Sequence, residues 1–260
     1  MNQAFTGNGL SLTPDGFDKA QSKLGVSAAS LWSLLTVETL GFGFLVDRRA
    51  KILFERHIFR KRTDGQFDTS NPDISSHNAG GYAGGAAEYL RLAKAISLNR
   101  QAALESTSWG LGQIMGFNAI ALGYSGVEDM VQRFMDGEDA QLDGTQRYIT
   151  NNKFLAEAFV KGDWKKVAFF YNGTTYAINQ YDVKLKRFFD LYKINGGPVI
   201  AIRSAQVKLA YLGFDSHGVD GVIGNGTSAA IVAFQAAHGI PQNGALDELT
   251  KSTLDQLMPS

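Results

Sequence analysis

The chain has 260 residues, 44% of them hydrophobic, so it is long enough to bury one large core or two smaller ones and is not expected to be disordered. Its 25 basic and 25 acidic residues balance, so the overall charge indicates neither a nucleic-acid partner nor an anionic membrane. The absence of cysteine excludes disulfides, thiolate metal sites and a cysteine nucleophile.

The N-terminal stretch from Met1 to Asp15 is polar and lacks the basic start and apolar run of an export signal. No later stretch approaches the roughly 20 apolar residues that span a bilayer. Apolar residues recur instead at three- and four-residue spacing, which is typical of amphipathic helices. This spacing predicts helices at 27–40, 86–104, 126–135, 138–150, 164–171 and 178–192.

The first predicted helix, 27–40, carries a carboxylate on its apolar face. If Ser27 caps the helix, three leucines share one face, namely Leu31, Leu34 and Leu35. The next position on that face is Glu38. Gly41 and Gly43 then stop the helix, which places Glu38 in the last turn with open space beside it.

A carboxyl on an apolar face is partly desolvated, which raises its pKa. Glycosidic cleavage needs such a group, because the leaving oxygen must receive a proton near neutral pH. Glu38 is therefore a candidate general acid. The alternative from spacing alone is that Glu38 caps the helix end or pairs with Arg48 or Arg49.

Three further local features are predicted in this part of the chain. Lys51 to Phe59 is rich in Ile, Leu and Phe without helical spacing, and is predicted to be a short strand. Thr63 to Gly85 is dense in Gly, Asn, Ser and Asp and is predicted to be a long loop. Ser125 and Glu128 have the spacing of a capping box at a helix start.

Several segments between residues 20 and 192 closely resemble the phage N-acetylmuramidase family. They are Glu38-Thr39-x-Gly41-x-Gly43-Phe44, Lys51 to Phe59, Gly80-Gly81-Tyr82, Ala103 to Asn118 with its Ser-Trp-Gly-Leu-Gly-Gln run, and Tyr171-Asn172-Gly173. The family is similar to goose-type lysozymes and soluble lytic transglycosylases within the lysozyme-like superfamily. The resemblance implies a mainly α, lysozyme-like catalytic domain with a small β element.

The resemblance also implies roles for individual residues. It makes Glu38 the general acid, places Gln113 in the wall of the cleft, and puts Tyr171 and Asn172 in contact with the sugar. Gly112 departs from the family, which usually has a bulky apolar residue there. The resemblance therefore does not fix the local shape of the cleft. From the residues alone, Tyr171 ends a core-packed helical face, and a purely structural tyrosine is the alternative.

A second catalytic carboxylate is predicted among two glutamates. Glu55 lies within the predicted strand, and Glu105 precedes the Ser-Trp-Gly-Leu segment, so either could face the cleft. A salt bridge to a nearby arginine is the alternative for both. Asp47 and Asp73, on predicted turns, are weaker candidates.

The segment Asn195-Gly196-Gly197-Pro198 predicts a domain boundary, which divides the chain into domains 1–195 and 199–260. In the second domain, Asp220-Gly221 and Asn243-Gly244 form two turns, and helices are predicted around 207–212, 228–237 and 250–257. This pattern resembles the type-1 peptidoglycan-binding domain, a three-helix unit. Asn243 and Asp247 depart from the usual Asp and Gly of that family. Asp220 and Phe234 are interpreted as turn and core residues.

Other chemistries find no support in the sequence. The four histidines lack zinc-ligand spacing, and neither a phosphate-binding loop nor a serine-hydrolase elbow is present. No metal and no cofactor are therefore expected. The expected partner is peptidoglycan glycan strands, without nucleic acid or membrane insertion, and the expected state is a monomer.

The function that the resemblance implies is an endolysin that hydrolyses the β-1,4 bond between N-acetylmuramic acid and N-acetylglucosamine. The enzyme would be made in the host cytoplasm and act on the cell wall, which lies in the periplasm of a Gram-negative host. The second domain would tether it and raise its effective concentration there. Two alternatives stay open: a lytic transglycosylase that forms 1,6-anhydro ends, and a non-catalytic cell-wall-binding or virion structural protein.

Overall fold

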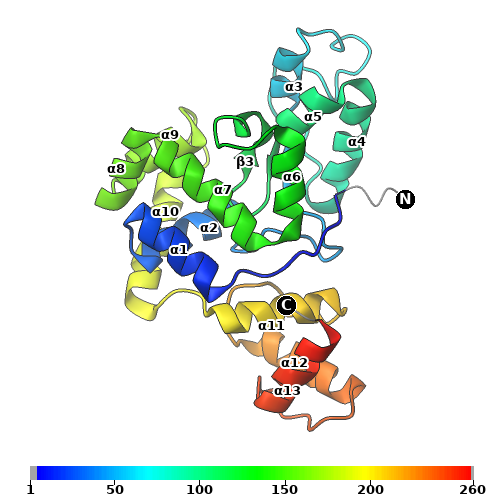
Figure 1. The fold of residues 1–260 in the computed structure, drawn as a ribbon, viewed down its shortest axis with the longest axis vertical. Helices are drawn as coiled ribbons and strands as arrows, with labels where there is room; N and C mark the ends of the chain where they lie inside the picture. The colour runs from blue at the N-terminus through cyan, green and yellow to red at the C-terminus, as the bar shows by residue number, and fades with distance from the viewer. Residues whose placement is uncertain (1–4, 259–260) are drawn as a thin grey trace. The chain divides into compact units, whose positions relative to one another are not determined.

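The computed structural model describes residues 5–258 and divides into two compact units (Figure 1). The sheet unit consists of Gly43–Asn152 with the N-terminal residues up to Gly9, and the helical unit consists of Leu10–Phe42 with the chain from Lys153 onward. Thirteen α-helices and one small sheet within these residues confirm the mainly α fold with a small β element. The domain limits 1–195 and 199–260 stay a prediction, and their outermost residues lie outside the described part of the chain.

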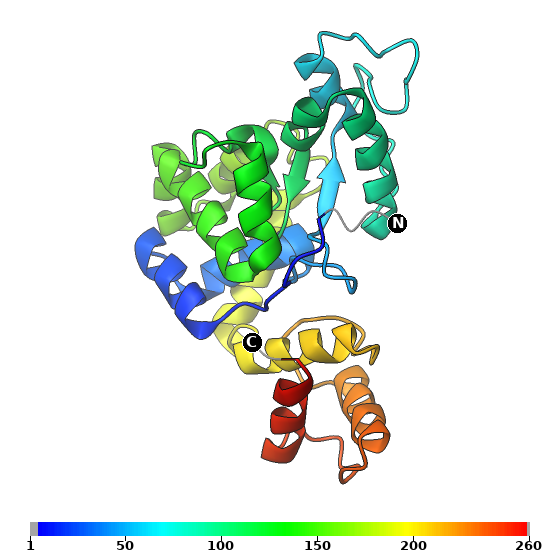
Figure 2. The same ribbon diagram turned by 45° about the vertical axis from the view of Figure 1, so that its right-hand side comes forward.

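The sheet unit is built around three short antiparallel strands, drawn as arrows in Figure 2. They are β1 (Ile52–Phe54), β2 (Thr107–Trp109) and β3 (Ile114–Met115), in the order β1-β2-β3. Ser108, in the central strand, pairs with Leu53 on one side and Met115 on the other. The Ser-Trp-Gly-Leu-Gly-Gln run therefore forms a β-hairpin.

The strand predicted over Lys51–Phe59 is wrong in its second half. The strand ends at Phe54, and α3 (Arg56–Arg62) begins immediately after Glu55. The physical reason is packing, because Phe59 folds back so that its ring lies 5.7 Å from that of Phe54 and is fully buried. An extended chain would carry Phe59 away from this core.

The long loop predicted from Thr63 to Gly85 is present as a series of turns that ends in a short 3-10 helix, η1 (Gly85–Ala87). The single helix predicted over 86–104 is divided into α4 (Glu88–Leu98) and α5 (Arg100–Glu105). Asn99 breaks it by adopting an extended conformation, and its side chain caps α5 by accepting a 2.9 Å hydrogen bond from the Ala102 amide.

The rest of the sheet unit contains η2 (Gly116–Asn118), α6 (Val127–Asp136) and α7 (Glu138–Asn151). The capping box predicted at Ser125 and Glu128 is wrong. The cap position of α6 is Gly126, and the Asp129 carboxylate accepts a 3.0 Å hydrogen bond from the Ser125 amide instead. Glu128 forms an ion pair with Arg100 at 2.6 Å, which draws its side chain away from the helix start.

The helical unit brings together segments from both ends of the chain. Its helices before the C-terminal region are α1 (Pro14–Leu24), α2 (Ala28–Thr39), α8 (Lys153–Lys161), α9 (Trp164–Asn172) and α10 (Tyr181–Asn195), with α10 packed against α2. The helices α1 and α8 were not predicted. For α1 the signals were present, because Thr13 caps the helix and Pro14 begins it.

The C-terminal module consists of α11 (Ile200–Tyr211), α12 (Asn225–Ala237) and α13 (Glu248–Leu257), which confirms the predicted three-helix unit (Figure 1). The three helices share one apolar core, formed by Ala205, Leu209, Ala230, Ile231, Phe234 and Leu254. Phe234 is fully buried, as interpreted from the sequence. Within residues 5–258, none of the helices is both long and apolar enough to cross a membrane.

Two buried glutamines hold the two turns of the module in the same way. The Gln206 amide nitrogen donates to Asp220 and Thr227, at 2.9 and 3.0 Å, and its oxygen accepts from the Gly221 amide at 2.8 Å. Asp220 is thus a turn residue, as interpreted from the sequence.

Gln235 repeats this arrangement in the second turn. Its amide nitrogen donates to Asn243 and Thr250, at 2.8 and 2.9 Å, and its oxygen accepts from the Gly244 amide at 3.0 Å. The two departures from the family pattern compensate each other here, because the Asn243 amide donates a 2.8 Å hydrogen bond to Asp247. An aspartate at position 243 would face the Asp247 carboxylate and repel it.

We predict that Gln235→Ala lowers the free energy of unfolding of the full chain by about 2–3 kcal/mol, because it removes the partner of the buried Thr250 hydroxyl and of the partly buried Gly244 amide. Urea unfolding followed by circular dichroism measures the loss. The matched control is Gln256→Ala, an exposed position of α13 that should change stability by less than about 0.5 kcal/mol. Equal losses in both variants would contradict this account of the turn.

Candidate active site

Glu38 lies in the last turn of α2, as predicted. Ser27 caps the start of the helix by accepting a 3.1 Å hydrogen bond from the Ser30 amide. At the other end, Leu40 rather than a glycine adopts the left-handed conformation, with φ of 57°. The Gly41 amide, with φ of 77°, then donates to the Leu35 carbonyl at 3.1 Å, which closes the helix.

The helix that carries Glu38 is buried on almost all sides, including at its serine and threonine positions. Such a helix belongs to a core, so the backbone around the carboxyl is held by packing. The Glu38 residue itself is half-buried, which leaves it accessible to a ligand. Burial raises the pKa of Glu38 to about 7, and a hydrogen bond from the Tyr181 hydroxyl limits the rise.

The contacts of Glu38 differ from the structural alternative weighed on the sequence. Its hydrogen-bond partner is Tyr181, whereas Arg49 forms an ion pair with Asp47 at 2.6 Å. Asp73 is likewise paired, with Lys94 at 2.8 Å. Both aspartates, the weaker candidates, therefore take part in exposed ion pairs.

Tyr181 is the site residue that the sequence analysis missed. It is buried at the start of α10, and its ring stacks on Tyr171 at the end of α9, with centroids 6.5 Å apart and planes 17° from parallel. The structure thus connects Tyr171 to Glu38 through Tyr181. Asn172 lies beside Tyr171 and is exposed. Nothing in the local sequence around Tyr181 indicates its partner, because 143 residues separate the two.

Glu55 lies in the sheet unit, at the junction between β1 and α3. Both of its carboxylate oxygens accept from the Tyr82 hydroxyl at 3.0 Å, and His57 Nδ1 lies 3.1 Å from one of them. Burial and the adjacent Glu55 charge raise the pKa of Tyr82 to about 12, so the phenol remains a hydrogen-bond donor at neutral pH. Among the described residues no arginine pairs with Glu55, and the hydrogen bonds from the Tyr82 hydroxyl hold its carboxylate.

The loop that carries Tyr82 is held by a buried carboxylate that the sequence analysis did not identify. Glu88 is fully buried and accepts hydrogen bonds from the amides of Ala83 and Gly84. It also pairs with Arg91 at 2.9 Å, which compensates the buried charge. The Gly80-Gly81-Tyr82 motif is thus fastened to α4, and Tyr82 is fixed against Glu55.

Glu105 makes the arginine contact that was the alternative prediction for both glutamates. It forms an ion pair with Arg62 of α3 and accepts a 3.1 Å hydrogen bond from Gln101. Its side chain is 18% exposed, similar to the 16% of Glu55, so exposure does not distinguish the two. The ion pair with Arg62 distinguishes Glu105 from Glu55.

The amide group of Gln113 is used within its own hairpin. Its nitrogen donates to the Gly110 carbonyl at 2.8 Å, and its oxygen accepts from the Ser108 hydroxyl at 2.8 Å. Gln113 has a φ of 50°, so these bonds stabilise a left-handed turn. Gly112, the departure from the family, has no room for a side chain because a Cβ there would overlap Thr145.

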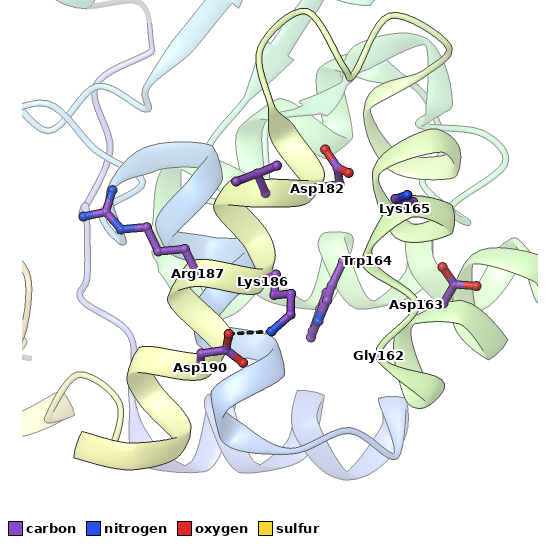
Figure 3. A pocket seen from close by; sticks show the side chains of 9 residues that line it. Gly162, Asp163, Trp164, Lys165, Asp182, Lys186, Arg187 and Asp190 are labelled. Atoms are coloured by element: carbon purple, nitrogen blue, oxygen red, sulfur yellow. Dashed lines mark hydrogen bonds and ion pairs between the residues drawn. The ribbon is translucent and has the colours of Figure 1, made fainter.

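A separate groove lies between the start of α9 and α10, with a volume of about 750 Å³ (Figure 3). Trp164 forms part of its lining, and Asp182, Lys186 and Asp190 line it from successive turns of α10. Tyr181 lies on a different face of α10, the one packed against α2. The groove therefore does not contain Glu38, and none of its residues was predicted as a site residue.

Two known protein families match this chain. Residues 27–193 match the family model described as N-acetylmuramidase, and residues 200–254 match a model described as a peptidoglycan binding domain. The chain belongs to the N-acetylmuramidase family and is a glycoside hydrolase that acts on peptidoglycan.

Among solved structures, the chain is similar to a crystal structure of the Burkholderia AP3 phage endolysin. The two are 40% identical, the match covers 74% of this chain and 73% of that one, and the TM-score is 0.64. Comparison with curated proteins gave no match. The roles of Glu38, Glu55, Glu105, Gln113, Tyr171 and Asn172 stay predictions.

The raised pKa of Glu38 predicts a pH-dependent difference in stability between the wild type and Glu38→Gln. The folded state favours the protonated acid, so this contribution is complete below pH 4.5 and is lost as the pH rises through about 7. Glutamine does not titrate and can still accept from Tyr181. Relative to the wild type, the variant should therefore gain up to about 3 kcal/mol of unfolding free energy between pH 4.5 and 8.

Chemical denaturation at a series of pH values measures this difference. Glu157→Gln is the control, because Glu157 is exposed and its ion pair, with Lys153 at 4.0 Å, is a weak surface pair. Its difference from the wild type should stay nearly constant over the same range. A constant difference for Glu38→Gln as well would show that the Glu38 carboxyl is not desolvated in solution.

Proposed function

We propose that the chain is an endolysin that cleaves the β-1,4 bond between N-acetylmuramic acid and N-acetylglucosamine, with Glu38 as the general acid. The observation that carries the proposal is the Glu38 carboxyl, half-buried at the end of α2, with a pKa raised to about 7. At neutral pH and below, such a group still holds the proton that the leaving oxygen requires.

Tyr181 acts on the Glu38 carboxyl both before and after the proton transfer. Its hydroxyl holds the Glu38 carboxyl in one orientation before the reaction, which keeps the proton directed at the bound substrate. After the proton has left, the same hydrogen bond stabilises the carboxylate, since it favours the charged form. Tyr171, stacked on Tyr181, supports that orientation, and Tyr171 and Asn172 are proposed to contact the sugar.

Glu55 is proposed as the second carboxylate, in preference to Glu105. The Tyr82 hydroxyl holds its carboxylate, and no arginine among the described residues pairs with it, whereas Glu105 is paired with Arg62. A water molecule would complete the hydrolysis, with Glu55 positioning it or stabilising the positive charge that develops on the sugar. Gln113 is proposed to form the cleft wall through the shape of its hairpin.

The finer biological setting is part of the proposal. Similarity to a phage endolysin supports synthesis in a host cytoplasm and release to the cell wall, the periplasm in a Gram-negative host, through a membrane pore formed by another protein. The match to a peptidoglycan binding domain supports glycan strands as the partner of the C-terminal module. We propose that the enzyme works as a monomer, without nucleic acid and without membrane insertion.

The test of Glu38 is the Glu38→Gln variant, assayed on outer-membrane-stripped cells and on purified peptidoglycan. Loss of the general acid should reduce the rate by about 10²–10⁴-fold while binding to the wall persists. Mass spectrometry of the wild-type products separates the two chemistries, because hydrolysis yields muropeptides one water heavier than the anhydro products of a lytic transglycosylase. Substantial lysis by Glu38→Gln would remove Glu38 from the mechanism.

The second carboxylate is tested by comparing Glu55→Gln with Glu105→Gln. We expect Glu55→Gln to lower kcat by about 100-fold at unchanged stability, since Glu55 is proposed to act directly on the water or the sugar. We expect Glu105→Gln to stay within about threefold of the wild-type kcat and to lose at most about 1 kcal/mol, since its ion pair is partly exposed. The reverse order of the two kcat values would assign the role to Glu105.

A further inference from the structure

The first helix of the C-terminal module is buried on two faces. Ala205 and Leu209 belong to the core of the module itself. Arg203 lies on another face and is fully buried. Its guanidinium donates to the Gly41 carbonyl and lies 5.3 Å from the ring of Trp32 in α2.

Neighbouring contacts extend this attachment along α11. One residue after Arg203, the Ser204 hydroxyl accepts a 3.0 Å hydrogen bond from Ser11. Two turns further on, the ring of Tyr211 lies 6.3 Å from that of Phe42. The segment from residue 11 to residue 42 thus packs against one face of α11, in addition to its contacts with α10.

The connection between α10 and α11 is also packed. A Cβ at Gly197 would overlap the Trp32 ring, so the chain passes directly over that indole. The Val199 amide then donates to the Gly221 carbonyl at 3.1 Å, which ties the connection to the first turn of the module. This is not the arrangement of a flexible linker, in which few contacts cross the boundary.

The carbonyl that Arg203 contacts belongs to the turn that ends the Glu38 helix. Gly41 closes α2 through its amide, and its carbonyl lies at the negative end of the helix dipole, where a cation is favourable. A hydrogen bond from a charged group is stronger than one between neutral groups, and more so when buried. Arg203 therefore restrains a turn that begins two residues after Glu38.

We propose that Arg203 is a positioning residue for the catalytic acid, through which the C-terminal module holds the end of the Glu38 helix in place. The proposal rests on the proposed function of Glu38. It gives the module a second role besides wall binding, because the module becomes a support of the active site. It also predicts that loss of this contact changes the chemistry of Glu38 without changing affinity for the wall.

The readout is the pH at which activity falls on the alkaline side. Among the described residues, the titratable and charged groups seen against α2 and its end are Tyr181, which donates to Glu38 and stacks on Tyr171, Tyr192, whose hydroxyl lies 2.9 Å from that of Thr36, and Arg203 itself. Burial raises the pKa of Tyr192 further from neutrality, whereas the pKa of Glu38 is about 7, so this limb of the profile reports Glu38. A looser turn admits water, and the pKa of Glu38 falls from about 7 toward 4.5.

The experiment compares Arg203→Met, Arg203→Lys and Lys208→Met in the full chain, with soluble peptidoglycan fragments as substrate. Lys208 is the matched control, because it is a buried cation of the same helix whose amine pairs with Asp255 at 2.5 Å inside the module. We expect Arg203→Met to move the alkaline limb down by about one pH unit and to lower kcat at pH 7 about fivefold, with KM changed less than about twofold.

We expect Arg203→Lys to lie between the wild type and Arg203→Met, and Lys208→Met to keep the wild-type limb. Pelleting with insoluble walls should be equal in all variants. If Arg203→Met does not fold, the limb of Arg203→Lys decides. A wild-type limb and kcat in the folded arginine variants, with only a lower melting temperature, would overturn the proposal. Activity retained by Glu38→Gln would instead overturn the function of Glu38.

Discussion

The burial of the Glu38 carboxyl at the end of α2 has an energetic cost that interactions in the surrounding structure must offset. A desolvated carboxyl is costly in its charged form, so the helix that carries it must be held by other interactions. The leucines and Trp32 of α2 provide them, because they are buried against the rest of the helical unit. Tyr181 then offsets part of the desolvation by donating to the carboxyl. The pKa near neutrality is the balance of these two effects, and neither a fully exposed nor an arginine-paired carboxyl would have it.

The position of Glu38 could be predicted from the sequence, because helical periodicity is local and a glutamate at the fourth position of a leucine face is easily recognised. The same holds for the three-helix module, whose turns have short, regular signals. The strand over Lys51–Phe59 was predicted wrongly beyond Phe54, because a run of apolar residues does not reveal that Phe59 packs back onto Phe54. Tertiary packing decided there between two local conformations that composition leaves equal.

The partners of the site residues could not be predicted. Tyr181 meets Glu38 across 143 residues, and Tyr82 meets Glu55 from a loop that Glu88 holds at Ala83 and Gly84. Spacing likewise could not distinguish Glu55 from Glu105, since the arginine that pairs with Glu105 comes from α3, whose first half was predicted as strand. Long-range contacts of this kind arise from the fold as a whole, and a single sequence contains no signal for them.

The paired glutamines of the C-terminal module have a consequence for the life of the enzyme. A short three-helix unit buries little apolar surface, and proteins of that size commonly depend on disulfides or a structural metal. Here the neutral amides of Gln206 and Gln235 connect the turns to the helices, in a chain that has no cysteine. Such staples need no oxidant to form and no metal to be supplied, and they are indifferent to reductants. The fold of the module therefore depends neither on the redox state nor on the metal content of its surroundings.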